Sequence, residues 1–459
     1  MKQPNPLGYA PIGRLIARFA IPSIISMLVS AAYNITDQIF IGHVVGMLGN
    51  AATNVAFPTV IMTTAFAQLV GVGTAANFNI HMGGKEEEEA KKFVGTGLTA
   101  MLLAGILVGG CILLFKTPIL LFCGATGNVL PYASEYLGIT ALGLPCLLFT
   151  NSSSNLIRAD GSPSYSMLCN VSGALLNIAL DWLFMVVFPW GIQGAAIATV
   201  IGQAVSFLLC LIYFPRFKTF RIREEMLGIR FHYFKQILRL GVSNFINHSM
   251  MMVVNIVLNN SLKHYGSFTL YGSDIPLAVA GVIAKLNSIL TAFAVGLSQG
   301  CQPIWGFNMG AKNYFRVKEA YKKAAVVALA ISMTAFVLFQ TFPRQITGIF
   351  GTGEELYFQF AEQYLHTYML MVCVFGIQPM TINYFTGIGQ MKQGIFISLS
   401  RQGLFLVPLL LILPLKFGLD GVLYAGPIAD FSAFLLSVTM VYFSFKKLDR
   451  LEQDKQVVG

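Results

Sequence analysis

Four polar residues stand in otherwise apolar segments, and their side chains suit the binding of a small cation. Asn177 and Asp181 are four residues apart, so both side chains lie on one face of a helix. Asp37 and Thr199 lie in two other apolar segments. Carboxylate and other oxygen ligands suit hard cations, and a carboxylate also accepts a proton. Ionisable groups inside membrane spans are costly, so each of these acids is a candidate for function.

The depth of these residues can be estimated from the rise of a helix, about 1.5 Å per residue. By that measure Asp37, Asp181 and Thr199 all lie roughly 10 Å from the same membrane face. Tyr33 and Asn34 precede Asp37 and are expected to support it. We therefore predict one site that holds a proton or a sodium ion. The alternative is structural: Asp37 caps a helix, Asp181 satisfies neighbouring backbone groups, and Thr199 packs between helices.

The segments that carry these residues belong to a chain built for a membrane. Of 459 residues, 55% are hydrophobic and 11% are charged, whereas soluble domains carry about 25% charged residues. A helix needs about 20 mostly apolar residues to cross a bilayer. No cleavable signal peptide and no alternating β-barrel pattern are apparent. We predict twelve spans, at about 14–41, 52–80, 93–115, 133–157, 166–188, 192–214, 237–260, 276–304, 320–342, 357–385, 394–414 and 419–445.

The basic residues predict how these spans are oriented. With the N-terminus in the cytoplasm, 25 Lys and Arg residues fall on the inner side and 4 on the outer side. Such an excess marks the cytoplasmic side, so both termini are expected there. The net charge of +10 is then a signal of topology and of attraction to anionic lipid. No nucleic-acid partner is needed to explain it.

The two halves of the sequence repeat each other. Met82-Gly83-Gly84-Lys85 matches Met309-Gly310-Ala311-Lys312 at an offset of 227 residues, and Gly191 matches Gly418 at the same offset. With six spans in each repeat, the halves are parallel and related by an axis along the membrane normal. We predict an all-α polytopic fold of two six-helix bundles: an N-lobe at 1–222, an amphipathic cytoplasmic linker at 215–239 and a C-lobe at 236–459 with a short basic tail.

The second half lacks an acid equivalent to those of the first, but it has other polar residues. Lys285 is the deepest cation, and it could pair with Asp430 or contact an anionic substrate. Arg401 is expected only to extend to the inner surface. Residues that could line a C-lobe cavity, or bond between helices, are Asn244 and His248.

Enzyme chemistry finds no support in the sequence. It contains no Walker A motif, no HExxH and no DDxxD-like motif. Its seven cysteines include no CxxC pair, which argues against a zinc site or a disulfide framework. We expect no enzyme activity, no resident metal and no cofactor other than the coupling ion.

Four motifs, in this order along the chain, resemble those of the multidrug and toxic compound extrusion (MATE) family. They are YNITDQIFIG from Tyr33, NLIRADGSP from Asn155, NIALD from Asn177 and QPIWGFNMGAKN from Gln302. The resemblance runs from about residue 10 to 447 and is nearest to the MepA-like bacterial branch. In members with a coupling site in the N-terminal half, the corresponding residues are Asp37, Asn177, Asp181 and Thr199.

The resemblance implies a monomeric antiporter of the inner membrane that exports cationic or amphipathic drugs, including antibiotics, in exchange for protons or sodium ions. The expected partners are small organic molecules and membrane lipid, without an obligate protein partner. Two alternatives remain. A lipid-linked saccharide flippase of the same superfamily would need a strongly cationic cavity, and a polytopic membrane transferase would need clustered acids or histidines near one membrane face.

Overall fold

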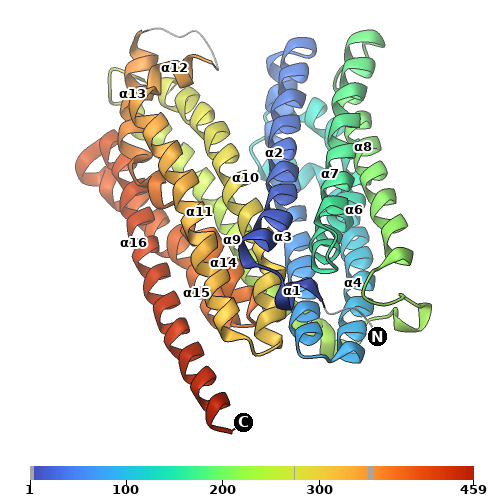
Figure 1. Cartoon of the computed structure of the whole chain (residues 1–459). Helices are drawn as coiled ribbons and strands as arrows, with labels where there is room; N and C mark the ends of the chain where they lie inside the picture. The colour runs from blue at the N-terminus through green and yellow to red at the C-terminus, as the bar shows by residue number, and fades with distance from the viewer. Residues whose placement is uncertain (1–4, 273, 350–354, 459) are drawn as a thin grey trace.

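Long apolar runs fold as helices in a membrane because their backbone groups must then bond to one another. The computed structural model describes residues 5–272, 274–349 and 355–458, and in these ranges it contains helices and no strand (Figure 1). The all-α prediction is confirmed.

Five of the first six spans are single long helices, and the fifth continues from an α-helix into a π-helix. The N-lobe consists of α1 (Pro6–Tyr9), α2 (Ile12–Val44), α3 (Met47–Gly83), α4 (Glu87–Leu114), α5 (Lys116–Phe122), α6 (Leu130–Ala159), α7 (Pro163–Asp181), the π-helix η1 (Trp182–Val187) and α8 (Gly191–Tyr213). The connection to the second half contains two 3-10 turns, η2 (Phe214–Arg216) and η3 (Glu224–Met226). The two very short helices α1 and α5 do not cross the membrane.

The second half contains more interrupted spans. The C-lobe consists of α9 (Phe231–Gly266), α10 (Asp274–Gly310), α11 (Tyr314–Thr341), α12 (Pro343–Gly348), α13 (Glu355–Tyr368), the 3-10 helix η4 (Leu370–Val374), α14 (Ile377–Gly387), α15 (Met391–Leu399), the π-helix η5 (Ser400–Leu406) and α16 (Val407–Val458). Below, N-lobe means α1–α8 and C-lobe means α9–α16.

The number of crossings agrees with the predicted twelve. Ten helical stretches of the described chain are long and apolar enough to cross a membrane, and α13 with η4 and α14 forms an eleventh that bends by 40°. The last stretch, Met391–Asp454, has 64 residues, or about 96 Å of helix, too long for one crossing of about 30 Å. Gly418 breaks it with φ 57° and ψ −135°, which yields the twelfth.

The repeat seen in the sequence reappears as a reciprocal contact between the lobes. A Cβ atom built on Gly83 would lie 1.9 Å from the carbonyl oxygen of Phe307, and one built on Gly310 would lie 1.8 Å from that of Ile80. Both pairs are related by the same offset of 227 residues. The backbones of α3 and α10 therefore touch where only glycine fits, and the contact is two-fold symmetric.

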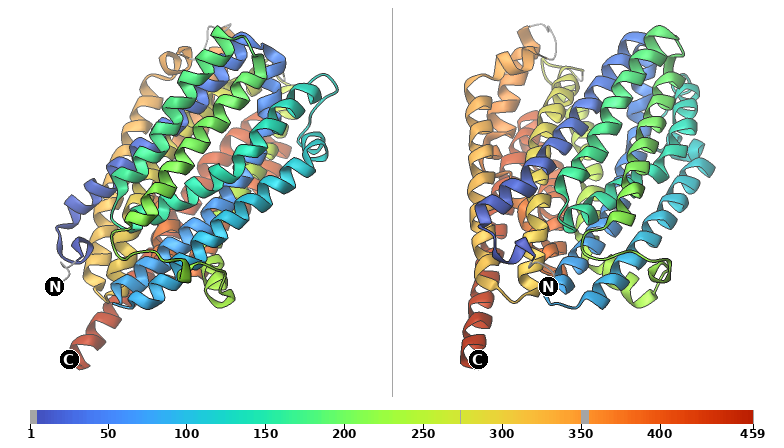
Figure 2. Two further views of the ribbon diagram at one scale, coloured as in Figure 1. Left: turned by 90° about the vertical axis from the view of Figure 1, so that its right-hand side faces the viewer. Right: turned by 45° about the vertical axis from the view of Figure 1, so that its right-hand side comes forward.

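Both chain ends that the structure describes lie at the same end of the molecule, as an even number of crossings requires (Figures 1 and 2). We call this the terminal face. That it lies in the cytoplasm stays a prediction, as do the lobe boundaries at residues 222 and 236. The outermost residues of the predicted lobes, 1–4 and 459, lie outside the described residues.

The first part of the linker differs from the predicted amphipathic strip. Phe217 and Phe220 are buried, and their rings lie 5.7 and 6.1 Å from the ring of Phe78 on α3. These two aromatic residues therefore pack on protein and not on lipid. The helix α9 begins at Phe231, so the last part of the predicted linker is the start of the seventh span.

Candidate functional site

Three helices bring the predicted polar residues of the N-lobe together. Asp37 lies on α2, Asn177 and Asp181 on the last turns of α7, and Thr199 on α8. Asp181 is fully buried, and Asn177 is 3% exposed. The Asn177 Nδ2 atom donates to Asp181 Oδ1 at 3.5 Å and to Thr199 Oγ1 at 3.4 Å. One amide group thus links α7 to α8 through two side-chain oxygens.

The carboxyl groups of Asp37 and Asp181 lie within hydrogen-bonding reach of each other. One oxygen of each, Asp37 Oδ1 and Asp181 Oδ2, is buried without a donor among the described residues, and so is Asn177 Oδ1. Buried polar atoms in folded proteins almost always have a partner. Facing carboxylates also repel unless a cation lies between them. The arrangement therefore fits a proton shared by the two acids, or a sodium ion held by their oxygens with Asn177 and Thr199.

The two predicted supporting residues of α2, Tyr33 and Asn34, differ in their surroundings. Tyr33 lies near both carboxyl groups, as expected. Asn34 is exposed, and its Nδ2 atom donates to the carbonyl oxygen of Ser30 at 2.7 Å. That Asn34 supports the site stays a prediction.

One residue of the site was not predicted. Tyr136 of α6 lies near both carboxyl groups and within hydrogen-bonding reach of the Thr199 side chain. It therefore adds a phenol from α6 to the group of side chains around the two acids. The sequence could not have predicted this residue. Tyr136 lies on α6, which carries no other candidate site residue, so no spacing pattern links it to the acids.

The C-lobe contains a buried ion pair between Asp430 and Arg401. The sequence had suggested Lys285 as the partner of Asp430. Arg401 Nε lies 2.5 Å from Asp430 Oδ1, and the two side chains are 15% and 8% exposed. The prediction that Arg401 only extends to the inner surface is wrong, since this carboxylate holds it among the helices. The Phe375 ring lies 5.4 Å from the guanidinium carbon, close enough for a cation–π contact.

The remaining C-lobe candidates are Asn244, His248 and Lys285. Asn244 is 8% exposed, and its Nδ2 atom has no acceptor there. His248, on the next turn of α9, is half-buried. Lys285 of α10 is also half-buried. That these three residues line a cavity stays a prediction.

A π-helix adjoins the Asp37–Asp181 group in the N-lobe and another adjoins the Arg401–Asp430 pair in the C-lobe. In the N-lobe, η1 begins directly after Asp181, and in the C-lobe Arg401 is the second residue of η5. Such wide turns are rare and often occur at functional sites, because they shift the side chains around them. Periodicity of apolar residues in the sequence did not reveal either one.

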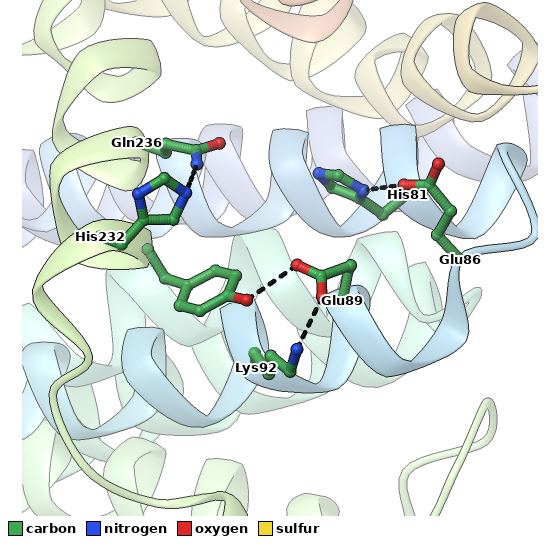
Figure 3. Close-up of polar contacts among 7 residues, drawn as sticks. His81, Glu86, Glu89, Lys92, His232 and Gln236 are labelled. Atoms are coloured by element: carbon green, nitrogen blue, oxygen red, sulfur yellow. Dashed lines mark hydrogen bonds and ion pairs between the residues drawn. The ribbon is translucent and has the colours of Figure 1, made fainter.

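The lobes meet through polar contacts on the side of the terminal face. Buried Arg158 of α6 donates to Gln299 Oε1 of α10 at 2.9 Å. Nearby, the Tyr233 hydroxyl at the start of α9 donates to Glu89 of α4 at 2.8 Å, and Lys92 donates to the same carboxylate at 2.7 Å (Figure 3). Figure 3 also shows the pairs His81–Glu86 and His232–Gln236 beside this contact.

Similar proteins have been found both by sequence and by structure. Multidrug export protein MepA of Staphylococcus aureus (strain MSSA476) is 25% identical over 441 residues, which cover 94% of each chain. A MOP superfamily transporter from Pyrococcus furiosus has the same fold, with a TM-score of 0.90 and 23% identity over 97% of this chain and 98% of that one. An outward-facing multidrug resistance MATE family transporter also scores 0.90, at 23% identity over 96% of this chain and 98% of its own.

The family model described as MatE matches the chain twice, once in each lobe. The matched residues are 22–183 and 240–412. The first match contains Asp37, Asn177 and Asp181, and the second contains Arg401. Since the two matches together cover well over half of 459 residues, the chain belongs to the MatE family.

Proposed function

We propose that this protein is a secondary antiporter that exports organic cations or amphipathic drugs in exchange for protons or sodium ions. The observation that carries the proposal is the pair of facing acids, Asp37 and Asp181, with buried oxygens that lack a donor among the described residues. Membership of the MatE family and the similarity to a multidrug export protein support the export of drugs.

The acids are well placed to couple an ion to a movement of helices. Asp37 is on α2 and Asp181 is on α7, so binding a cation between them removes a repulsion between two helices. Loss of the cation restores that repulsion and favours separation of the helices. Binding of the ion therefore changes the packing of α2 in the N-lobe. The same helix contacts the C-lobe, since Gly296 and Gly300 of α10 lie close to Ile24 and Ala20.

For a neutral substrate, the membrane potential acting on one coupling ion supplies enough energy for useful export, whereas one-for-one exchange of a monovalent organic cation is electroneutral and is driven by the concentration gradient of the coupling ion. Moving one charge inward through 100 mV supplies about 2.3 kcal/mol. By the rule of tenfold per 1.4 kcal/mol, this corresponds to roughly a fiftyfold gradient of a neutral substrate. In an inner membrane the site would open alternately to the two sides, with both termini in the cytoplasm.

Replacing Asp181 by Asn tests the proposal. Asn has nearly the same volume but cannot be ionised, so it cannot exchange a proton or balance a sodium ion. We expect the Asp181→Asn variant to lose uptake of a fluorescent organic cation, such as ethidium, into everted vesicles. The matched control is Asp420→Asn, because Asp420 is an exposed acid at the start of the last span, and it should transport at the parent rate.

The choice between proton and sodium needs a second measurement. In proteoliposomes that contain the parent protein, a pH gradient and a sodium gradient are imposed separately. The gradient that drives ethidium transport identifies the coupling ion. Undiminished transport by a correctly folded Asp181→Asn variant would refute the role of this acid, and transport driven by neither gradient would refute antiport.

A further inference from the structure

The linker between the lobes is fastened to the N-lobe at several points. Asp160, at the end of α6, accepts hydrogen bonds from the backbone nitrogens of Lys218 and Thr219 at 2.7 and 3.0 Å. It also accepts one from the Tyr213 hydroxyl at 2.6 Å. Together with the buried rings of Phe217 and Phe220, these bonds fix the first part of the linker to protein.

The second part of the linker lies directly against α4. A Cβ atom built on Gly95 of α4 would lie 1.9 Å from the carbonyl oxygen of Met226, so the two backbones touch there. Two residues later, the Gly228 nitrogen donates to the Thr99 hydroxyl at 2.9 Å. Gly228 has φ 126°, a conformation that L-residues with side chains rarely adopt.

The charge pattern of α4 places these contacts in the outer third of the hydrocarbon core, on the side of the terminal face. The charged residues of α4 end at Lys92, and residues 93–114 are uncharged. These residues form about 33 Å of helix, which matches a hydrocarbon core of about 30 Å. The core therefore begins near Phe93, and Gly95 and Thr99 lie about 3 and 9 Å inside it. At this depth the Gly228 nitrogen needs a partner, and Thr99 provides it.

The exposed side chains of this segment are apolar or basic, apart from two glutamates. Three large apolar side chains are exposed: Leu227 is 48% exposed, Ile229 is 45% and Phe231 is 77%. Three exposed arginines flank them, at positions 221, 223 and 230. Only two acids, Glu224 and Glu225, lie among them. An apolar face with basic residues beside it is typical of segments that bind anionic membrane surfaces.

We propose that this segment, residues 221–231, binds the phosphate headgroup of an anionic phospholipid in the leaflet on the terminal face. Leu227, Ile229 and Phe231 enter the acyl region, and the positive charges of Arg221, Arg223 and Arg230 attract the phosphate. The linker is fixed to the N-lobe and continues directly into α9, the first helix of the C-lobe. A lipid bound there thus contacts the only covalent connection between the lobes. The inference depends on insertion of the chain in a membrane and not on the proposed antiport.

Quenching of a tryptophan by brominated lipid measures the headgroup preference directly. Phe231→Trp places the reporter in the segment, and the chain that retains Phe231 supplies the background from its three native tryptophans. The full-length protein is reconstituted in phosphatidylcholine vesicles that contain a small fraction of either brominated phosphatidylglycerol or brominated phosphatidylcholine. We expect the reporter to favour phosphatidylglycerol by about fivefold or more, given the attraction of each basic residue to anionic lipid.

Two variants with equal loss of charge separate a site from a general effect of net charge. The triple variant Arg221→Gln, Arg223→Gln, Arg230→Gln should lose the preference. The control carries Lys446→Gln, Lys447→Gln and Arg450→Gln, three exposed basic residues at the end of α16, and should keep it. An equal preference in parent and triple variant would overturn the proposal, and so would an equal loss in the control. Neither result depends on whether ethidium is transported.

Discussion

At the scale of single residues, the buried pair of Arg401 and Asp430 allows a sharp test, because removing one member leaves the other charge uncompensated. Such a loss typically costs 3–5 kcal/mol, whereas an apolar pair of similar size is often tolerated. We expect Asp430→Leu to lower the apparent Tm of the purified protein in detergent strongly, and the double variant with Arg401→Leu to recover much of the loss. A double variant that is less stable than the single one would contradict this account of the pair.

The same pair illustrates what single residues in a sequence reveal. Asp37, Asn177, Asp181 and Thr199 could be chosen because ionisable and polar residues are rare in apolar runs, and a simple estimate of depth predicted one common level. The partner of Asp430 could not be predicted. Lys285 and Arg401 are both cations within C-lobe spans, and only the packing of the helices determines which of them lies beside Asp430. Tyr136 was missed for a related reason: a tyrosine near a span end is too common to indicate a site.

At the scale of elements, Asp160 joins the end of α6 to the linker after α8. All four of its partners donate to it: two backbone nitrogens and the hydroxyls of Tyr213 and Thr219. An Asn there would turn an NH2 group toward donors. Since hydrogen bonds to charged groups contribute about 1.5–3 kcal/mol each, Asp160→Asn should lower the apparent Tm and make the linker more sensitive to trypsin. Exposed Asp454 serves as the control, and Asp454→Asn should change neither.

Elements were predicted in number better than in detail. The runs of apolar residues were long enough to predict twelve crossings, because a chain without a β-barrel pattern can cross hydrocarbon only as helices. The break at Gly418 falls between the two predicted spans 394–414 and 419–445, which the sequence had already separated. The π-helices η1 and η5 and the bend at η4 had no such signal, since they keep the same apolar composition and change only the hydrogen-bond register. Likewise, the phenylalanines of the linker looked amphipathic because their protein partner, Phe78, is distant in sequence.

At the scale of the whole molecule, the reciprocal contact of Gly83 and Gly310 holds the lobes together on the side of the terminal face. The proposed alternating access requires this contact to separate in part of the cycle. A side chain at either position would meet a backbone carbonyl that cannot move aside within its helix. We therefore expect Gly83→Val to shift the protein toward a state in which the lobes are apart on this side.

Spin labels measure that separation. In a background without native cysteines, Glu88→Cys on α4 and Phe315→Cys on α11 place one label on an exposed position of each lobe. Pulsed electron–electron distances should lengthen in the Gly83→Val variant. The control is Gly110→Val, since nothing lies within 4 Å of a Cβ built on Gly110, and its distances should match those of the parent. Unchanged distances in Gly83→Val would mean that the helices absorb the side chain locally, and that this contact does not control the closure.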